Sequence, residues 1–253
     1  MSLPGVRGQR PRRKNVMTDI TCLLRCPLCG GAFSKKDNSL VCGKRHCYDI
    51  ARQGYVNFVP GQKDMFYKKE LFEARAAVFA AGIYAPVVAR LSDVLSRYAP
   101  GENPVIVDAG CGEGYYTKAV CPERAMTRIG FDLSKDAVKL AARGKKTAAF
   151  FAADLKRIPL ADGCADAVLD IFTPADYSEF KRILKPDGVL IKLAPRSGYL
   201  RSCGKRRAIC CAGRNTTTAT WRAMRRRRWR FSIARRSPIR WTLRLRRRRI
   251  WRG

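Results

Sequence analysis

Three cysteines and the only histidine of the chain lie at spacings suited to binding a metal ion. Cys26 and Cys29 form a Cys-x2-Cys pair, and His46 follows Cys42 after three intervening residues. Two such pairs on facing turns supply the four tetrahedral ligands that a structural zinc ion requires. The alternative is that these cysteines are small buried apolar residues. We expect a zinc ion with four protein ligands, and therefore a structural rather than a catalytic metal.

Two further cysteines compete for places in this ligand set. Cys22 lies four residues before Cys26, and Cys47 is adjacent to His46. Either one has the spacing to replace a ligand, although three cysteines and one histidine remain the first choice. The chain holds eleven cysteines and no recognisable export signal, which favours reduced thiols that serve in metal binding or packing.

A glycine-rich segment carries the second chemical signal. Gly110, Gly112 and Gly114 follow an apolar run that ends at Asp108, and a helical pattern begins at Tyr115. Glycines allow a sharp turn and let a ligand lie against bare amide groups at the start of a helix. Dinucleotide sites favour the spacing G-x-G-x-x-G. The spacing here, G-x-G-x-G after an aspartate, is similar to the pattern of S-adenosylmethionine-dependent methyltransferases. We therefore expect Asp108 and these three glycines to bind that cofactor.

Two acidic residues follow later predicted strands. Asp132 ends the second strand, twenty residues after Gly112, where a carboxylate can accept hydrogen bonds from both ribose hydroxyls of a nucleoside cofactor. Asp154 follows the third strand, where its side chain is within reach of an adenine amino group. The alternative for each is a local role as a helix cap or loop residue. We favour the ribose role for Asp132 and leave both readings open for Asp154.

These residues need a parallel sheet to position them, and the pattern predicts an α/β fold with a Rossmann-like methyltransferase domain. Nearly all-apolar strands alternate with short helices, which is typical of a parallel sheet covered on both faces. Strands are predicted at Val105–Asp108, Arg128–Asp132, Ala148–Ala152, Ala167–Phe172 and Gly188–Leu193, and helices at Tyr115–Val120, Lys135–Arg143 and Tyr177–Leu184. The predicted divisions are a disordered extension at 1–21, a zinc-binding module at 22–60, a helical linker at 61–100, the cofactor-binding core at 101–200 and a tail at 201–253.

The net charge of +32 is distributed unevenly along the chain. The tail holds nineteen Arg, one Lys and no acidic residue, so residues 1–200 carry +12. That remaining charge suggests a polyanionic partner such as nucleic acid, although basic residues also keep a domain soluble. The tail keeps no helical or alternating period, and its composition is typical of an out-of-frame reading of a GC-rich gene. We therefore expect a frameshift near residues 201–203 and a disordered tail; a genuine RNA-binding arginine segment is the alternative.

The chain shows no membrane or secretory signal. No apolar run reaches 18 residues, and the basic stretch before Met17 has no apolar core, so we expect no membrane association and a cytoplasmic location. Met17 is predicted to be the natural start.

Taken together, these motifs resemble one family, the bacterial 23S rRNA guanine-N1 methyltransferases. The residues that carry the resemblance are Cys26–Cys29, Cys42–His46 with Asp49, Gly54–Asn57 and Asp108–Thr117. The resemblance implies that Cys26, Cys29, Cys42 and His46 bind zinc and that Gly112 and Glu113 line the S-adenosylmethionine site. It also implies that Tyr84 reaches over the cofactor. Tyr199 matches one further cofactor contact, at a position that can be histidine in the family.

The implied reaction is methyl transfer to guanine N1 in 23S rRNA, for which the sequence identifies no catalytic base. The zinc module and the basic linker residues Lys63, Lys68, Lys69 and Arg75 are expected to face RNA, or else to form a solvated charged surface. The family continues past residue 200 with closing strands that this sequence does not show. Their loss would expose a sheet edge and leave the chain inactive. A small-molecule methyltransferase, a non-catalytic RNA-binding protein and a homodimeric assembly remain open.

Overall fold

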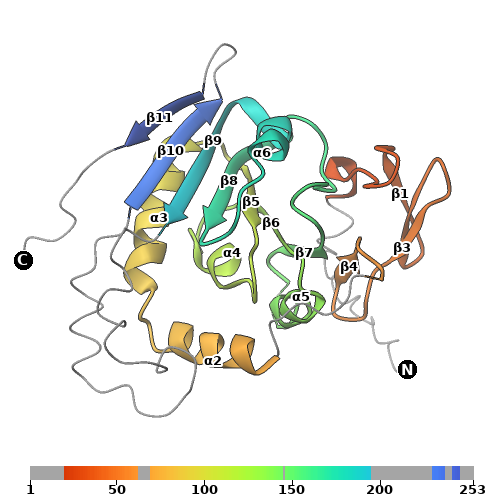
Figure 1. The fold of residues 1–253 in the computed structure, drawn as a ribbon, viewed down its shortest axis with the longest axis horizontal. Coiled ribbons are helices and arrows are strands. Elements are labelled where there is room, and N and C mark those ends of the chain that lie inside the picture. The colour runs from red at the N-terminus through yellow and green to blue at the C-terminus, as the bar shows by residue number, and fades with distance from the viewer. Residues whose placement is uncertain (1–19, 62–68, 145, 195–229, 237–240, 246–253) are drawn as a thin grey trace, which may run out of the picture.

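The computed structural model describes residues 20–61, 69–144 and 146–194, together with the strand backbones at 230–236 and 241–245 (Figure 1). Several predicted features lie outside these described residues. They are the N-terminal extension with Met17, the linker residues Lys63 and Lys68, and the cofactor contact Tyr199.

An eight-stranded sheet forms the centre of the fold, in the order β11-β10-β9-β8-β5-β6-β7-β4 (Figure 1). The strands are β4 (Tyr55–Asn57), β5 (Val105–Ala109), β6 (Thr127–Asp132), β7 (Ala149–Ala152), β8 (Ala165–Ile171), β9 (Leu184–Ala194), β10 (Arg230–Arg236) and β11 (Trp241–Leu245). All pairings from β4 to β9 are parallel. The predicted α/β fold with a parallel sheet is therefore confirmed, because strands buried on both faces are nearly continuous apolar runs.

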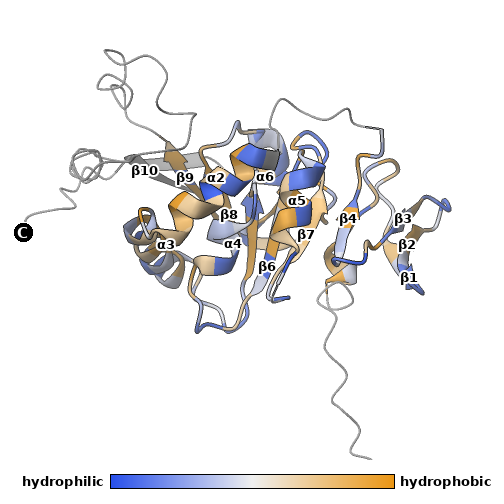
Figure 2. Cartoon of the chain, turned by 90° about the horizontal axis from the view of Figure 1, so that it is seen from below, coloured by the Kyte–Doolittle hydropathy of each residue, from blue (hydrophilic) through white to orange (hydrophobic). Residues whose placement is uncertain are grey.

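Helices cover the sheet on both faces. They are α2 (Lys69–Ala80), α3 (Ala85–Tyr98), α4 (Tyr115–Ala119), α5 (Lys135–Ala141) and α6 (Tyr177–Ile183). The helices α3, α4 and α5 pack against one face, which includes Ile106 and Phe150, whereas α6 packs against the other, which includes Val107 and Val168. Figure 2 shows hydrophobic residues on inner strands such as β7 and hydrophilic residues on outward helix faces. This alternation along the strands creates two cores, one on each face.

Caps fix where the shorter helices begin. Ser134 accepts a hydrogen bond from the Ala137 N–H at 3.3 Å and starts α5. Asp176 accepts hydrogen bonds from the N–H groups of Ser178 and Glu179 and starts α6. Such caps satisfy amide groups that lack partners in the first helical turn.

The described part of the linker forms two helices. Gly82 lies between α2 and α3, whereas Pro86 lies in the first turn of α3, where proline is well tolerated. In the described part of the chain no single helix has the length and apolarity to cross a membrane. The pair α2 and α3 passes such a test only in combination, across a bend of 79°.

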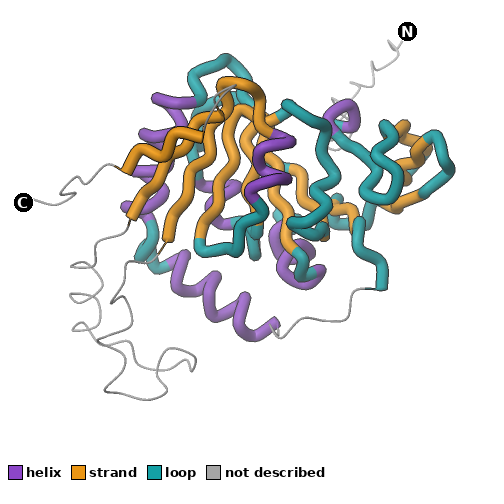
Figure 3. The backbone as a smooth tube through the Cα atoms, turned by 45° about the horizontal axis from the view of Figure 1, so that its top comes forward, coloured by secondary structure: helices purple, strands orange, loops and turns teal. Residues whose placement is uncertain are grey.

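The zinc module is joined to the large sheet. Its own sheet contains β1 (Phe33–Lys36), β2 (Ser39–Cys42) and β3 (Cys47–Asp49), while β4 pairs with β7 (Figure 3). The rings of Phe58 and Phe151 meet at 5.5 Å between centroids, within a core cluster that spans module and sheet. The module therefore covers part of the same sheet face as α6.

The structure corrects the expectation that the closing strands are missing. Strand β10 pairs antiparallel with β9, with Phe231 opposite Leu193, and β11 pairs antiparallel with β10. Strand pairing uses backbone N–H and C=O groups, and the edge of β9 offers a row of them. Such pairing needs no sustained side-chain periodicity, so the absence of a period in residues 201–253 does not exclude these strands. The frameshift remains a prediction about the gene, and the rest of the tail lies outside the described residues.

Candidate functional site

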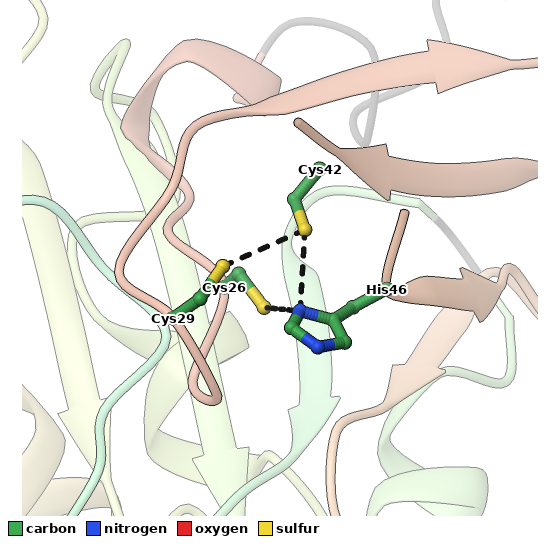
Figure 4. Close-up of side chains that lie close together, drawn as sticks. All are labelled: Cys26, Cys29, Cys42 and His46. Carbon is green, nitrogen blue, oxygen red and sulfur yellow. Dashed lines mark hydrogen bonds between the residues drawn. The ribbon is translucent and has the colours of Figure 1, made fainter. Parts of the chain in front are cut away.

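Four side chains of the zinc module converge on one point (Figure 4). Their ligand atoms, from Cys26, Cys29, Cys42 and His46, all lie within 4.8 Å of one another. The Cys42 Sγ lies 3.6 Å from the Cys29 Sγ and 3.4 Å from the His46 Nδ1, and the Cys26 Sγ lies 3.4 Å from the same nitrogen. A tetrahedron with zinc–ligand bonds of about 2.0–2.3 Å has edges close to these values. The geometry therefore suits zinc.

Two tight turns aim these ligands. The Gly30 N–H donates to the Cys26 carbonyl at 2.7 Å, and the Arg45 N–H donates to the Cys42 carbonyl at 2.8 Å. Burial raises the pKa of Cys42, but hydrogen bonds from the backbone of His46 and Lys44 and from the thiols of Cys29 and Cys26 outweigh it and lower that pKa to about 7. The lowered pKa favours the thiolate, which is the metal-binding form.

The two competing cysteines lie elsewhere. Cys22 and Cys47 are both exposed, and neither belongs to the cluster of four that the described residues form. Cys47 is next to His46 in sequence, but it begins β3, whereas His46 belongs to the turn that precedes this strand. The placement of the side chains thus favours the set with three cysteines and one histidine.

The glycine-rich turn lies where β5 ends. The N–H groups of Gly110 and Cys111 both donate to the Phe131 carbonyl, at 2.8 and 2.9 Å, which ties the turn to β6. Gly110 has φ +71°, and a β-carbon there would lie 2.1 Å from the Thr173 Oγ1. The loop after β8 therefore packs so closely on this turn that only glycine fits.

Asp108 connects the end of β5 to the following helix. Its carboxylate is buried and accepts a hydrogen bond from the Thr117 hydroxyl at 2.5 Å. Burial raises the pKa of Asp108 to about 7, and the nearby charge of Asp132 adds to the rise. Asp108 was predicted as a cofactor-binding residue, and the structure places it beneath the turn rather than on its surface.

Asp132 holds the outer side of the turn. Its Oδ2 accepts from the Gly112 N–H at 2.9 Å, and its Oδ1 accepts from the Ser134 N–H at 2.9 Å. Ser134, not Asp132, is the cap of α5. Each carboxylate oxygen has a second lone pair, so both stay able to accept from ribose hydroxyls.

The Glu113 carboxylate is buried and accepts no hydrogen bond from the described residues. Its side chain is 8% exposed, and neither of its oxygens has a hydrogen-bond partner among the described residues. Burial raises the pKa of this carboxyl group above its ordinary value, and the nearby Arg75 guanidinium opposes the rise. Buried polar atoms without partners are uncommon and need an explanation, such as a ligand.

Arg75, which was expected to face RNA, lies at this turn; a contact with RNA stays a prediction. Its Nε is 3.4 Å from the Glu113 Oε1, and its Nη2 is 3.4 Å from the position of a β-carbon built on Gly112. Sequence spacing gives no signal for this contact, because Arg75 and Glu113 are far apart in the chain and meet only when α2 crosses the turn.

Tyr84 and Asp154 have local partners. Tyr84 precedes α3 and packs against Phe79, with ring centroids 5.2 Å apart, beside the helix that follows the glycine turn. Asp154 accepts from the Lys156 N–H at 3.0 Å, as expected of a loop aspartate. An adenine contact by Asp154 stays a prediction.

One aromatic residue that the sequence pattern did not single out directly precedes Thr173, which packs on the glycine turn. Phe172 directly follows β8, is 41% exposed, and has φ +58°. A positive φ is unusual for a bulky residue, and such backbone strain is concentrated at functional sites. The combined exposure and backbone geometry have no signature in the linear sequence.

The arrangement fits a nucleoside cofactor that carries an ammonium group. Helices leave the sheet on opposite faces around β5 and β8, and ligands of such sheets bind at the carboxyl ends of the strands at this switch point. Gly112, Glu113 and Asp132 lie there, and the carboxylates of Glu113 and Asp132 match the ammonium group and ribose of S-adenosylmethionine.

Two family models match the chain. The zinc-ribbon model described as "RlmA, N-terminal" matches residues 24–65, and the model described as "Methyltransferase domain" matches residues 107–192. The first contains the four clustered metal ligands, and the second contains the glycine turn and Asp132. The chain therefore combines a zinc ribbon with an S-adenosylmethionine-dependent methyltransferase domain.

Three curated relatives match most of the chain. The 23S rRNA (guanine(748)-N(1))-methyltransferase of Streptomyces fradiae is 36% identical over 192 residues, which cover 74% of this chain and 67% of that protein. YxjB of Bacillus subtilis (strain 168), named for a 23S rRNA (guanine-N(1)-)-methyltransferase activity, is 39% identical over 186 residues, or 70% and 66%. A similarly named protein of Micromonospora griseorubida is 36% identical over 203 residues, or 72% and 68%. The matches thus span about two thirds of these relatives. On this identity and coverage, the chain belongs to the family of 23S rRNA (guanine-N(1)-)-methyltransferases.

Proposed function

We propose that this chain transfers the methyl group of S-adenosylmethionine to N1 of a guanine in 23S rRNA. The observation that carries the proposal is the buried carboxylate of Glu113 at the glycine turn, in a chain of this family; it lies 3.4 Å from the Arg75 guanidinium but accepts no hydrogen bond from the described residues. A buried carboxylate without hydrogen bonds is costly, so a cationic ligand that donates to it would stabilise the site.

The chain's own residues bind and orient the two reactants. Asp132 accepts from the ribose, Gly112 allows the cofactor to lie against the backbone, and Glu113 receives the ammonium group. When bound, S-adenosylmethionine supplies an electrophilic methyl group on its sulfonium. Holding donor and acceptor in line contributes a large part of the rate enhancement in such transfers.

Phe172 is suited to hold the acceptor base. It lies at the end of β8, next to Thr173, which packs on the glycine turn. Unpaired RNA bases stack on exposed aromatic rings, and each stacked base contributes about 1–3 kcal/mol. We assign Phe172 the role of stacking on the target guanine.

The zinc ribbon has a structural role in this proposal. Its four ligands leave no open coordination position, so the metal holds the module together and the module offers a surface to RNA. A substrate of this kind implies action in the cytoplasm, where ribosomes are assembled.

Transfer of a labelled methyl group to stripped 23S rRNA tests the proposal. We expect label in 23S rRNA but not in 16S rRNA, and less label with the Gly112→Ala variant than with the control Gly144→Ala. Label that enters only small molecules would instead indicate a small-molecule methyltransferase. RNA binding without any transfer would indicate a non-catalytic binding protein, and either result would refute the proposal.

A further inference from the structure

Arg75 is held in a fixed position over the glycine turn. Its guanidinium carbon lies 5.9 Å from the ring centroid of Phe72 and 5.8 Å from that of Phe79, so two aromatic rings of α2 flank it. Phe79 in turn stacks on Tyr115, with ring centroids 4.1 Å apart and an angle of 6° between the planes. Cation–π contacts of this kind restrict an otherwise flexible side chain. The positive charge of Arg75 is therefore held over the glycine turn.

The guanidinium group of Arg75 is accessible to a ligand. The Arg75 side chain is 45% exposed although it contacts the buried Glu113, and its Nη2 lies over Gly112. The contact with Glu113 is 3.4 Å and is not a hydrogen bond, because neither Glu113 oxygen has a hydrogen-bond partner in the described residues. The guanidinium thus has N–H donors that this ion pair leaves unused.

Arg75 and Glu113 together match an α-amino-acid group. Such a group carries an ammonium and a carboxylate on one carbon, so its complement is an acid and a base side by side. Around the turn, Asp108, Asp132 and Glu113 are all acidic and would repel a ligand carboxylate. Arg75 is the cation that the structure places against Glu113 and Gly112. A planar guanidinium also binds carboxylates with two parallel hydrogen bonds.

We infer that Arg75 binds the methionine carboxylate of the cofactor while Glu113 receives its ammonium group. Arg75 is then a cofactor-binding residue supplied by the linker helix α2, outside the methyltransferase domain that the family model matches. This inference rests on the proposed use of S-adenosylmethionine.

Calorimetric binding of two ligands to the full chain tests the inference. One ligand is S-adenosylhomocysteine, and the other is the same molecule with hydrogen in place of its carboxylate. We expect the wild-type protein to bind the first about ten- to a hundredfold more tightly, as a charge-assisted pair predicts. Arg75→Gln should weaken S-adenosylhomocysteine by a similar factor and leave the decarboxylated ligand unchanged. Arg75→Lys should restore part of the affinity.

Arg90→Gln is the matched control, because Arg90 forms a surface ion pair with Asp93 at 3.8 Å on α3. It should bind both ligands as the wild type does. Equal weakening of both ligands by Arg75→Gln would show that Arg75 only supports Glu113, and no weakening would show no role; either result overturns the inference. If Arg75→Gln fails to fold, the wild-type preference still decides, since equal affinity for the two ligands also overturns it. Tight binding without methyl transfer to rRNA would refute the proposed function alone.

Discussion

Replacing Gly112 by alanine should weaken cofactor binding but should destabilise the fold only by the cost of a strained backbone. Gly112 has φ +55°, and a β-carbon there would lie 3.4 Å from the Arg75 Nη2, at the end of a flexible side chain. The methyl group therefore contacts only the guanidinium of Arg75 among the described residues, at a distance that a small shift relieves, and it occupies the surface on which we place the cofactor.

The expected cost in stability follows from the backbone. A non-glycine residue in the left-handed region costs roughly 1–2 kcal/mol. Gly144→Ala carries the same strain, because Gly144 has φ +83° and nothing within 4 Å of the added β-carbon. At Gly110 the added carbon would lie 2.1 Å from the Thr173 Oγ1, which adds about 1–3 kcal/mol of overpacking. Gly110→Ala should therefore lower the free energy of unfolding by about 2–5 kcal/mol.

Two measurements on the full chain check these values. Urea unfolding, followed by circular dichroism, should give similar free energies of unfolding for Gly112→Ala and Gly144→Ala and a lower value for Gly110→Ala. Calorimetry should show S-adenosylhomocysteine binding weakened more than about tenfold in Gly112→Ala, which corresponds to about 1.4 kcal/mol, and unchanged in Gly144→Ala. Equal cofactor affinity in those two variants would refute the placement of the cofactor against Gly112.

Three further predictions concern the metal, a buried acid and the acceptor side. Cys29→Ser should abolish zinc binding and lower the melting temperature of the whole chain by more than about 5 °C, because module and sheet share a core, whereas Cys22→Ser should do neither; metal analysis and thermal melting decide. Asp108 has a folded pKa of about 7 against an ordinary 3.8, so the folded state binds more protons between those values and its stability falls as pH rises through them. One pH unit corresponds to about 1.36 kcal/mol in the free energy of unfolding. Relative to the wild type, the free energy of unfolding of Asp108→Asn should therefore rise by up to roughly 4 kcal/mol between pH 4 and 8, as urea titrations measure it. A difference that stays constant with pH would contradict this. Phe172→Ala should reduce the methylation of rRNA about five- to a hundredfold at unchanged cofactor affinity, and full activity would exclude stacking on this ring.

Most of the sheet was predictable because its strands are marked by local patterns. The predicted strand Val105–Asp108 is extended by one residue in β5, and Lys135–Arg143 contains the whole of α5. Buried parallel strands are continuous apolar runs, and glycines and helix caps mark their ends. The zinc ligands were equally accessible, since their spacing is set by two local turns.

Contacts between distant segments were not predictable. Arg75 looked like one basic residue among several of the linker, and only the path of α2 over the glycine turn brings it to Glu113. The pairing of β10 with β9 depends on backbone groups and leaves no side-chain period to detect. Phe172 is distinguished by its φ and its exposure, which are properties of the folded loop.

The position of the methyl group on the product distinguishes methylation of guanine N1 from every other reaction of this fold. The 23S rRNA is incubated with the full chain and S-adenosylmethionine, digested to nucleosides and analysed by mass spectrometry against authentic standards. We expect N1-methylguanosine as the product, in a smaller amount when Gly112→Ala replaces the wild-type chain. A different methylated nucleoside, or unmodified guanosine alone, would contradict this expectation.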